Sequence, residues 1–355
     1  MATAENIKTI VGQITCPELD KSLDQLRMLG EVQQDGDTTN VQLLLPTHAY
    51  PQPERLTDLI MSAVKAAHGD DTKVAVKLDV KTRGKDSGGR VGLNVHNVIA
   101  VGSGKGGVGK STVAAALACG LQSFGAKVGL LDADVFGPSI PHMLGAKGQP
   151  GATEHTNAEG QKFLRMPPID VDGLKLISMA FFVDPGQSVV LRGPMVHKAL
   201  TQFLQSTDWG ELDYLIVDLP PGTGDVPLTI SQQVGLAGAV VVCTPQQVAL
   251  LDAIKAVDMY QKVNVPVLGF VENMSGEIFG RGGAEKVATE LKVPFLGEVP
   301  IDAKIREYGD AGKMMELLKE DSPSRDALRA VCQSVAMQVT RNTLESPAGP
   351  TLEIL

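Results

Sequence analysis

The first eighty residues combine two kinds of hydrophobic spacing. Apolar residues recur every three or four positions from Ile7 to Ile14 and from Leu56 to Ala67, which predicts two amphipathic helices. Between them, Asp35-Gly36 separates two extended runs, as expected for a strand pair. A further half-buried strand is predicted where apolar residues alternate with charged ones, at Val74, Val76, Leu78 and Val80. This pattern predicts a small α/β module over residues 1–80.

A different pattern begins after a charged, glycine-rich segment, Lys81–Arg90, which predicts a linker over residues 81–93. Short apolar runs then alternate with helical segments over residues 94–341. The runs are Val98–Val101, Val128–Leu131, Tyr214–Val217, Ala239–Val242 and Val267–Val271. Such runs are typical of strands buried on both faces, and their alternation with helices predicts a mainly parallel sheet flanked by helices. Residues 342–355 are expected to form a loose tail.

The segment Gly104–Ser111 (GKGGVGKS) matches the phosphate-loop pattern G-x-x-x-x-G-K-[ST]. It lies between the predicted strand Val98–Val101 and a predicted helix, Ser111–Phe124, so the partial positive charge of a helix N-terminus adds to the loop. Glycines let backbone N–H groups surround phosphate oxygens, Lys110 supplies a cation, and the hydroxyl of Ser111 can hold Mg²⁺. The residues expected to contact the nucleotide are Gly104, Lys105, Gly106, Gly107, Val108, Gly109, Lys110, Ser111 and Thr112.

Polar residues follow three of the predicted strands, where functional residues of a parallel sheet gather. Asp132-Ala133-Asp134 follows one strand and Asp218 another. A carboxylate beside a phosphate loop can hold Mg²⁺ or orient the attacking water, and we assign such roles to Asp134 and Asp218. Asn273 follows a third strand, and its amide can read the edge of adenine, although an ordinary turn would explain it equally well.

Two glycines, Gly222 and Gly224, lie in the loop after Asp218 (DLPPGTGD). Either could place a backbone N–H at the γ-phosphate, so the ATP and ADP states would order this loop differently.

Composition narrows the class of protein. The chain has 355 residues and a net charge of −9, which argues against a nucleic-acid scaffold. No stretch approaches the roughly 18 apolar residues that span a bilayer, and the N-terminus does not read as a signal peptide. The four cysteines are far apart and suit a reducing cytoplasm. We expect Cys119, Cys243 and Cys332 to be buried, and Cys16 to be the most exposed thiol.

Taken together, these motifs resemble the MinD/ParA group of ATPases with a deviant Walker A motif, and within it the Mrp/ApbC branch of iron–sulfur cluster carrier proteins. The resemblance covers nearly all of residues 94–313 and extends less closely to the first module. The matching stretches are Gly104–Ser111, Leu130–Leu144, Arg192–Met195, Trp209–Asp225, Thr244–Ala249, Glu272–Ser275 and Phe279–Lys286.

The resemblance implies a P-loop ATPase that works as a homodimer with ATP sandwiched between subunits. Lys105 would reach the partner subunit's nucleotide, while Lys110 and Ser111 would act within their own subunit. Asp134 would assist water activation, and Asp218 would be the Walker B acid. Asn273 would contact adenine. A labile [4Fe–4S] cluster would be carried on a shared surface and passed to apoproteins.

The sequence departs from this family where the cluster ligands usually lie. Members usually carry a C-x-x-C shortly after the E-N-M-S stretch, but here Ser275 is followed by Gly276-Glu277-Ile278-Phe279 and no cysteine. In the first module, Tyr50 occupies the usual cysteine position, and Cys16 stands where an acidic residue is usual. The sequence therefore assigns no cluster ligands.

Three interpretations remain. The first is a cytoplasmic ATPase that binds clusters and transfers them to apoproteins. The second keeps the ATP switch but makes the protein an adaptor for cluster-assembly proteins that holds no cluster itself. The third, a positioning ATPase on membrane or DNA, would require a basic C-terminal helix or surface, whereas Pro347–Leu355 is proline-broken and not basic. We therefore expect no nucleic-acid and no membrane partner.

Overall fold

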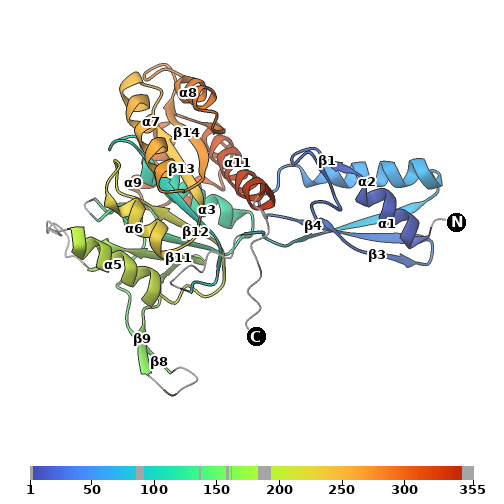
Figure 1. Ribbon diagram of the computed structural model, residues 1–355, viewed down its shortest axis with the longest axis horizontal. Helices are drawn as coiled ribbons and strands as arrows, with labels where there is room; N and C mark the ends of the chain where they lie inside the picture. Colours follow the sequence, from blue (N-terminus) through green and yellow to red (C-terminus); the bar gives the residue numbers. More distant parts are fainter. Residues whose placement is uncertain are drawn as a thin grey trace. The chain divides into compact units, whose positions relative to one another are not determined.

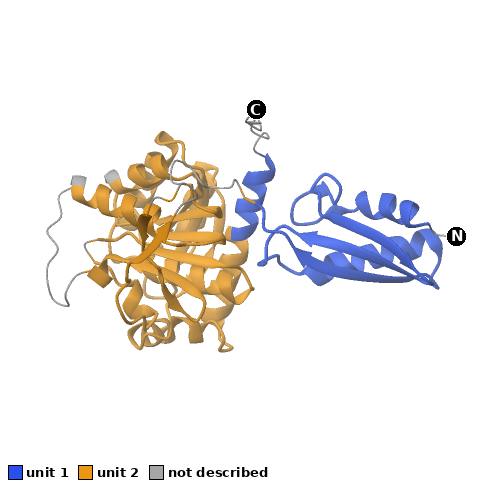
Figure 2. Ribbon diagram, turned by 90° about the horizontal axis from the view of Figure 1, so that it is seen from below, with its two compact units in different colours: residues 1–83, 336–355 blue, residues 84–335 orange. Residues whose placement is uncertain are grey.

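The computed structural model describes residues 3–84, 92–135, 137–156, 160, 162–182 and 193–345. The chain divides into two compact units, residues 1–83 with 336–355 and residues 84–335 (Figure 2). Most of the segment expected to be a linker, residues 85–91, lies outside the described residues. Within the described part of the chain, no helix has the length and apolar character needed to cross a membrane.

The first unit contains a three-stranded sheet of order β3-β4-β5, with β3 antiparallel and β5 parallel to the central β4. Buried residues of its two longer helices pack on the same alternating residues of β4, namely Val41, Leu43 and Leu45, so both helices cover one face of the sheet. This confirms the predicted helices and strands. The elements are α1 (Ala4–Gly12), β1 (Thr15–Cys16), β2 (Lys21–Ser22), β3 (Leu29–Asp35), β4 (Thr38–Leu45), α2 (Pro53–His68) and β5 (Lys73–Val80).

The C-terminal helix α11 (Pro323–Glu345) continues past the point where a tail was expected. It runs through Asn342 to Glu345, and its last turns belong to the first unit, where Met337 is part of the core and Leu344 packs against it. Residues 346–355 of the expected tail lie outside the described residues.

The second unit is built on an eight-stranded sheet of order β10-β11-β7-β12-β6-β13-β14-β15. All neighbours are parallel except β10 and β11, which confirms the predicted mainly parallel sheet. The five predicted strands are β6 (Val95–Gly102), β7 (Val128–Asp132), β12 (Leu212–Asp218), β13 (Leu236–Cys243) and β14 (Val267–Ser275). The remaining strands are β10 (Ile169–Val171), β11 (Leu174–Ser178), β15 (Phe295–Pro300) and a separate hairpin, β8 (Thr153–Thr156) with β9 (Lys162–Arg165).

Helices lie on both faces of this sheet (Figure 1). One core cluster joins buried residues of α5, α6, α7 and α8 to alternating residues of the central strands, such as Ala239 and Val241 of β13. The helices of the unit are α3 (Lys110–Ser123), α4 (Ile140–Met143), η2 (Met179–Phe182), α5 (Gly193–Ser206), α6 (Asp225–Gln233), α7 (Gln247–Lys262), α8 (Gly283–Leu291), α9 (Ala303–Asp310) and α10 (Met314–Leu317). The carboxyl ends of β6, β7, β12 and β14 consequently meet at one edge of the sheet.

Candidate nucleotide-binding site

The phosphate loop connects β6 to α3, as the sequence predicts. Gly107 and Gly109 have φ values of 80° and 78°, a region that L side chains rarely adopt, so glycine is required at both. At Gly104 the constraint is a close approach: an added Cβ would lie 2.1 Å from the backbone of Asp252 in α7. The loop is therefore held between its own helix and α7.

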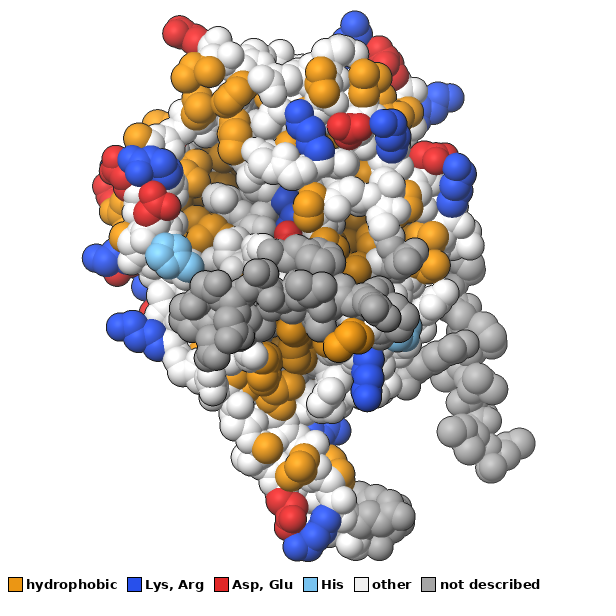
Figure 3. Space-filling view, turned by 90° about the vertical axis from the view of Figure 1, so that its left-hand side faces the viewer, with side chains coloured by type: hydrophobic (Ala, Val, Ile, Leu, Met, Phe, Trp, Pro, Cys, Tyr) orange, Lys and Arg blue, Asp and Glu red, His pale blue; other side chains and the backbone are white. Residues whose placement is uncertain are grey.

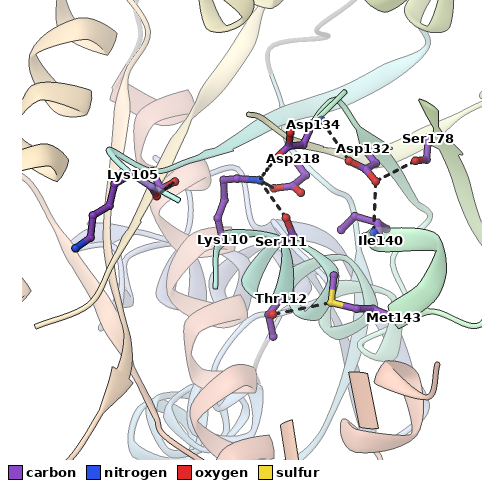
Figure 4. Close-up of polar contacts among 11 residues, drawn as sticks. Lys105, Lys110, Ser111, Thr112, Asp132, Asp134, Ile140, Met143, Ser178 and Asp218 are labelled. Atoms are coloured by element: carbon purple, nitrogen blue, oxygen red, sulfur yellow. Dashed lines mark hydrogen bonds and ion pairs between the residues drawn. The ribbon is translucent and has the colours of Figure 1, made fainter. Parts of the chain in front are cut away.

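Lys110 brings three of the predicted site residues together (Figure 4). Its ammonium nitrogen lies 2.6 Å from Oδ1 of Asp218, 3.7 Å from Oδ2 of Asp134 and 3.1 Å from Oγ of Ser111. The side chain of Lys110 is only 6% exposed, and that of Asp218 is fully buried. A buried lysine thus lies between two carboxylates, one just after β7 and one at the end of β12, and its charge offsets one of their two negative charges.

The two carboxylate oxygens of Asp218 differ in their contacts, since only Oδ1 pairs with Lys110. Oδ2 is buried and has no hydrogen-bond partner among the residues that the structure describes. Burial raises the pKa of Asp218, and the positive charge of Lys110 opposes that shift. A free carboxylate oxygen close to a loop hydroxyl is the oxygen donor set that Mg²⁺ takes in phosphate-loop sites, so Ser111 and Asp218 fit this ion.

Asp132 is a buried carboxylate to which sequence reasoning gave no role. It is the last residue of β7, and its oxygens accept hydrogen bonds from the Ser178 hydroxyl and from the backbone N–H of Asp134 and Ile140. Burial and the neighbouring Asp218 raise the pKa of Asp132, while its hydrogen bonds from Ser178 and Asp134 and the charge of Lys110 oppose that shift. The sequence showed that Asp132 lies at the end of a strand. It could not show the hydrogen-bond partners of Asp132, because these depend on which strands lie beside β7.

Lys105 is not part of this cluster. Its side chain points away from Lys110 (Figure 4), and no ion pair within the described part of the chain involves its ammonium group. Its backbone carbonyl accepts a hydrogen bond of 2.9 Å from the Ser103 hydroxyl, which holds the loop backbone at this position.

Asn273 joins the phosphate loop to a large cavity. Its Nδ2 donates a 2.9 Å hydrogen bond to the backbone carbonyl of Val108. The cavity beside it has a volume of about 680 Å³ and a mainly apolar lining, and Thr112, Ser139 and Met143 also line the hollow at the phosphate loop. One continuous surface therefore offers a polar cradle at the loop and an apolar chamber beside it.

One of the two candidate N–H donors in the loop after Asp218 is already hydrogen-bonded within the protein. The N–H of Gly222 donates a 2.8 Å hydrogen bond to the carbonyl of Ser103, so it is not available to a phosphate. Gly224 lies at the N-cap of α6 and remains the candidate N–H donor. Pro221 lines the hollow at the phosphate loop, so movement of this segment would change the shape of that hollow.

The end of β14 is tied to the start of α8. The carboxylate of Glu272, which is fully buried, accepts hydrogen bonds from the N–H groups of Gly282 and Ala284 at 2.8 and 2.7 Å. Between these anchors, Gly276 and Gly280 exchange two backbone hydrogen bonds of 2.9 and 2.8 Å, and Ile278 at the tip is 74% exposed. A tight apolar turn thus stands where the family resemblance leads one to expect a cysteine pair.

All four cysteines are free and buried. The prediction that Cys16 is the most exposed thiol is wrong: its exposed fraction is 0%, because Sγ packs in the first core 3.1 Å from the Tyr50 hydroxyl. Burial raises the pKa of Cys16, and it raises that of each of the other three to about 12. Burial of Cys119, Cys243 and Cys332 is confirmed. Thiols in this condition are poor metal ligands, since the thiolate is the ligating form.

A parallel sheet, a glycine loop opening a helix, and carboxylates at the neighbouring strand ends define a P-loop nucleotide-binding protein. More narrowly, the chain belongs to the ParA family of NUBPL-type iron-transfer P-loop NTPases, whose family model matches residues 94–336.

Relatives match almost the whole chain. It is 43% identical to an iron–sulfur cluster carrier protein of Synechocystis over 97% of this chain and 100% of that protein. Identity to the Deinococcus radiodurans carrier is 45%, over 92% and 93% respectively. Among solved structures, a nucleotide-binding protein from Archaeoglobus fulgidus in complex with ADP has a TM-score of 0.54 and 38% identity over 66% of this chain and 91% of that one. MinD of Pyrococcus furiosus, with a TM-score of 0.51 and 23% identity over 67% and 98%, shares the fold.

Proposed function

We propose that this protein hydrolyses ATP as a switch in the transfer of iron–sulfur clusters to apoproteins. ATP hydrolysis is supported by four side chains that lie together beside the phosphate loop, those of Lys110, Asp134, Asp218 and Ser111. The cluster-transfer part rests on relatives of 41–46% identity, which are named iron–sulfur cluster carrier or transfer proteins. The free thiols fit a reducing cytoplasm.

In this mechanism Lys110 exchanges partners. When phosphates enter the loop, its ammonium group leaves the carboxylates and contacts the β- and γ-phosphates. Backbone N–H groups at the start of α3 contact the phosphate oxygens. Asp134, released from Lys110, orients the attacking water and takes its proton. Mg²⁺, held by Ser111 and Asp218, would neutralise charge on the phosphates.

Asn273 gives a reason for preferring adenine. Only its NH₂ group can donate to the Val108 carbonyl, so this contact fixes the orientation of the amide and leaves Oδ1 as an acceptor beside the second N–H of Nδ2. An acceptor suits the amino group of adenine and opposes the carbonyl oxygen of guanine. ATP is therefore the expected nucleotide in the neighbouring cavity.

A homodimer is part of the proposal. The side chain of Lys105 points away from Lys110 and makes no ion pair with the residues that the structure describes, which supports a role in contacting a nucleotide on a second copy. Figure 3 shows a face of the molecule on which several groups of hydrophobic side chains are exposed among charged ones. Exposed apolar surface of this kind favours association.

A second function is favoured by one specific observation, the burial of all four thiols. A [4Fe–4S] cluster normally requires four thiolates, and this chain presents none at its surface. The alternative is an ATP-dependent adaptor that brings cluster-assembly proteins and apoproteins together without holding the cluster.

Anaerobic reconstitution with iron and sulfide separates the two functions. Iron content per chain and the absorbance of the cluster are read before and after a chelator, with and without ATP, and transfer to an apoprotein is then measured. Little uptake of iron by the purified protein alone would favour the adaptor. Chelator-resistant uptake close to stoichiometric, abolished by Cys16→Ala or another single cysteine replacement, would instead establish a carrier and identify its ligand.

A further inference from the structure

We propose that Asp132 is a positioning residue for ATP hydrolysis: it sets the place of Asp134 by holding both ends of the loop that carries it. This inference rests on the proposed ATPase function. It concerns a residue that lies outside the phosphate loop and is neither of the two acids paired with Lys110. Its basis is the set of three hydrogen bonds that converge on one buried carboxylate.

The strand order brings these partners together. Asp132 ends β7, and its neighbours in register are Ser178 at the end of β11 and Asp218 at the end of β12. Its side chain is fully buried. A buried carboxylate at this place requires hydrogen-bond donors, because burial of an unpaired charge is strongly unfavourable.

One oxygen holds the start of the loop. Oδ1 of Asp132 accepts the backbone N–H of Asp134 at 3.2 Å. The preceding residue is held as well, since the N–H of Ala133 donates to the backbone carbonyl of Asp218 at 2.9 Å. The backbone of Asp134 is therefore fixed relative to both β7 and β12, while its side chain reaches Lys110 at 3.7 Å.

The other oxygen holds the end of the loop and the neighbouring strand. Oδ2 accepts the Ser178 hydroxyl at 3.0 Å and the N–H of Ile140, the first residue of α4, at 3.4 Å. The same serine hydroxyl accepts the N–H of Ala180. Asp132 thus joins the water-activating residue to β11 and α4. Within the described part of the chain its hydrogen bonds reach no residue of the phosphate loop, so we expect it to affect hydrolysis rather than nucleotide affinity.

The test compares Asp132→Ala, Asp132→Asn and Ser178→Ala. We expect kcat of Asp132→Ala to fall about 10- to 100-fold, as for a catalytic group displaced by about 1 Å. Its Kd for a non-hydrolysable ATP analogue should change less than about threefold, because Lys110, the loop glycines and Asn273 are untouched. Asp132→Asn keeps one acceptor oxygen and should recover part of kcat. Ser178→Ala removes a buried donor of the same group without touching Asp134, and should reduce kcat much less than Asp132→Ala.

Hydrogen exchange at the amide of Asp134 gives a readout that does not depend on hydrolysis. It should accelerate in Asp132→Ala and remain slow in Ser178→Ala. The assignment would be overturned if wild type, Asp132→Asn and Asp132→Ala all had the same kcat. It would also be overturned if Asp132→Ala and Ser178→Ala lost the same amount of kcat. If Asp132→Ala does not fold, the assignment would be overturned by an Asp132→Asn variant whose kcat and whose hydrogen exchange at Asp134 are both unchanged. Absence of hydrolysis in the wild type would instead refute the proposed ATPase function and leave the exchange result to decide on Asp132.

Discussion

The side-chain amide of Asn273 donates to the backbone carbonyl of Val108, joining the end of β14 to the phosphate loop across 165 residues of sequence. The contact is buried, and Gly109 lies directly against it, since an added Cβ there would be 2.1 Å from Nδ2 of Asn273. The side chain of Asn273 therefore holds the loop in its present shape and also forms part of the wall of the neighbouring cavity.

Replacement of Asn273 should reduce the preference for ATP over GTP. In Asn273→Ala the fixed acceptor disappears, and the Val108 carbonyl loses its donor, so affinity for ATP should fall about 10-fold, the effect of roughly 1.4 kcal/mol. Affinity for GTP should change little. Calorimetry with both nucleotides measures the ratio, and an unchanged ratio would exclude Asn273 from base recognition.

Lys110→Ala should abolish hydrolysis and also destabilise the apoprotein. Loss of the cation facing the transferred phosphoryl group should lower kcat at least about 100-fold. Removal of one partner from the buried pair leaves Asp218 uncompensated, a change that typically costs about 3–5 kcal/mol. Turnover and thermal unfolding are measured beside Lys262→Ala, whose parent side chain is 73% exposed and should have no effect on either. Full activity of Lys110→Ala would refute the site.

Gly104→Ala should impair the phosphate loop through packing alone. The new methyl group would overlap the backbone of Asp252, which cannot move without displacing α7. We expect loss of ATP binding together with a lower Tm. Gly151→Ala is the matched control, because no atom lies within 4 Å of its added Cβ. Equal behaviour of the two variants would mean that α7 does not restrain the loop.

Lys105 tests the dimer. If it contacts the nucleotide of a second copy, Lys105→Ala should reduce hydrolysis more than it reduces ATP binding to the monomer. The Asp134→Ala variant, which blocks hydrolysis, should accumulate a dimer with ATP, and adding Lys105→Ala should shift it back to monomer. Light scattering or analytical ultracentrifugation gives the mass. A monomer under all conditions would remove the shared nucleotide from the mechanism.

Sequence patterns predicted the regular elements where burial was uniform along the chain. Each of the five central strands contains an uninterrupted apolar run, and the alternation of these runs with helices was enough to predict a parallel sheet. Several strands were not predicted, and for β11 and β15 the reasons are local. Lys175 interrupts the apolar run of β11, and β15 contains Gly297 and ends at Pro300, composition that occurs at sheet edges.

The site was only partly predictable, because some of its contacts join distant parts of the chain. The pattern G-x-x-x-x-G-K-[ST] carries its own chemistry, so Lys110 and Ser111 could be assigned directly. The partners of Asp132 depend on which strands flank β7, and Ser178 lies 46 residues away. Cys16 was misjudged for the same reason: its burial depends on packing beside Tyr50, 34 residues later.

The clamp formed by Glu272 makes the following turn a separable module. Because this carboxylate holds both β14 and the start of α8, the chain between Gly276 and Gly280 is closed at its base independently of its own length. Doubling the length of such a surface loop costs only about 0.6 kcal/mol of closure entropy. The protein therefore offers a natural grafting point, where a longer metal-binding segment can be gained or lost while the adjoining strand end stays anchored.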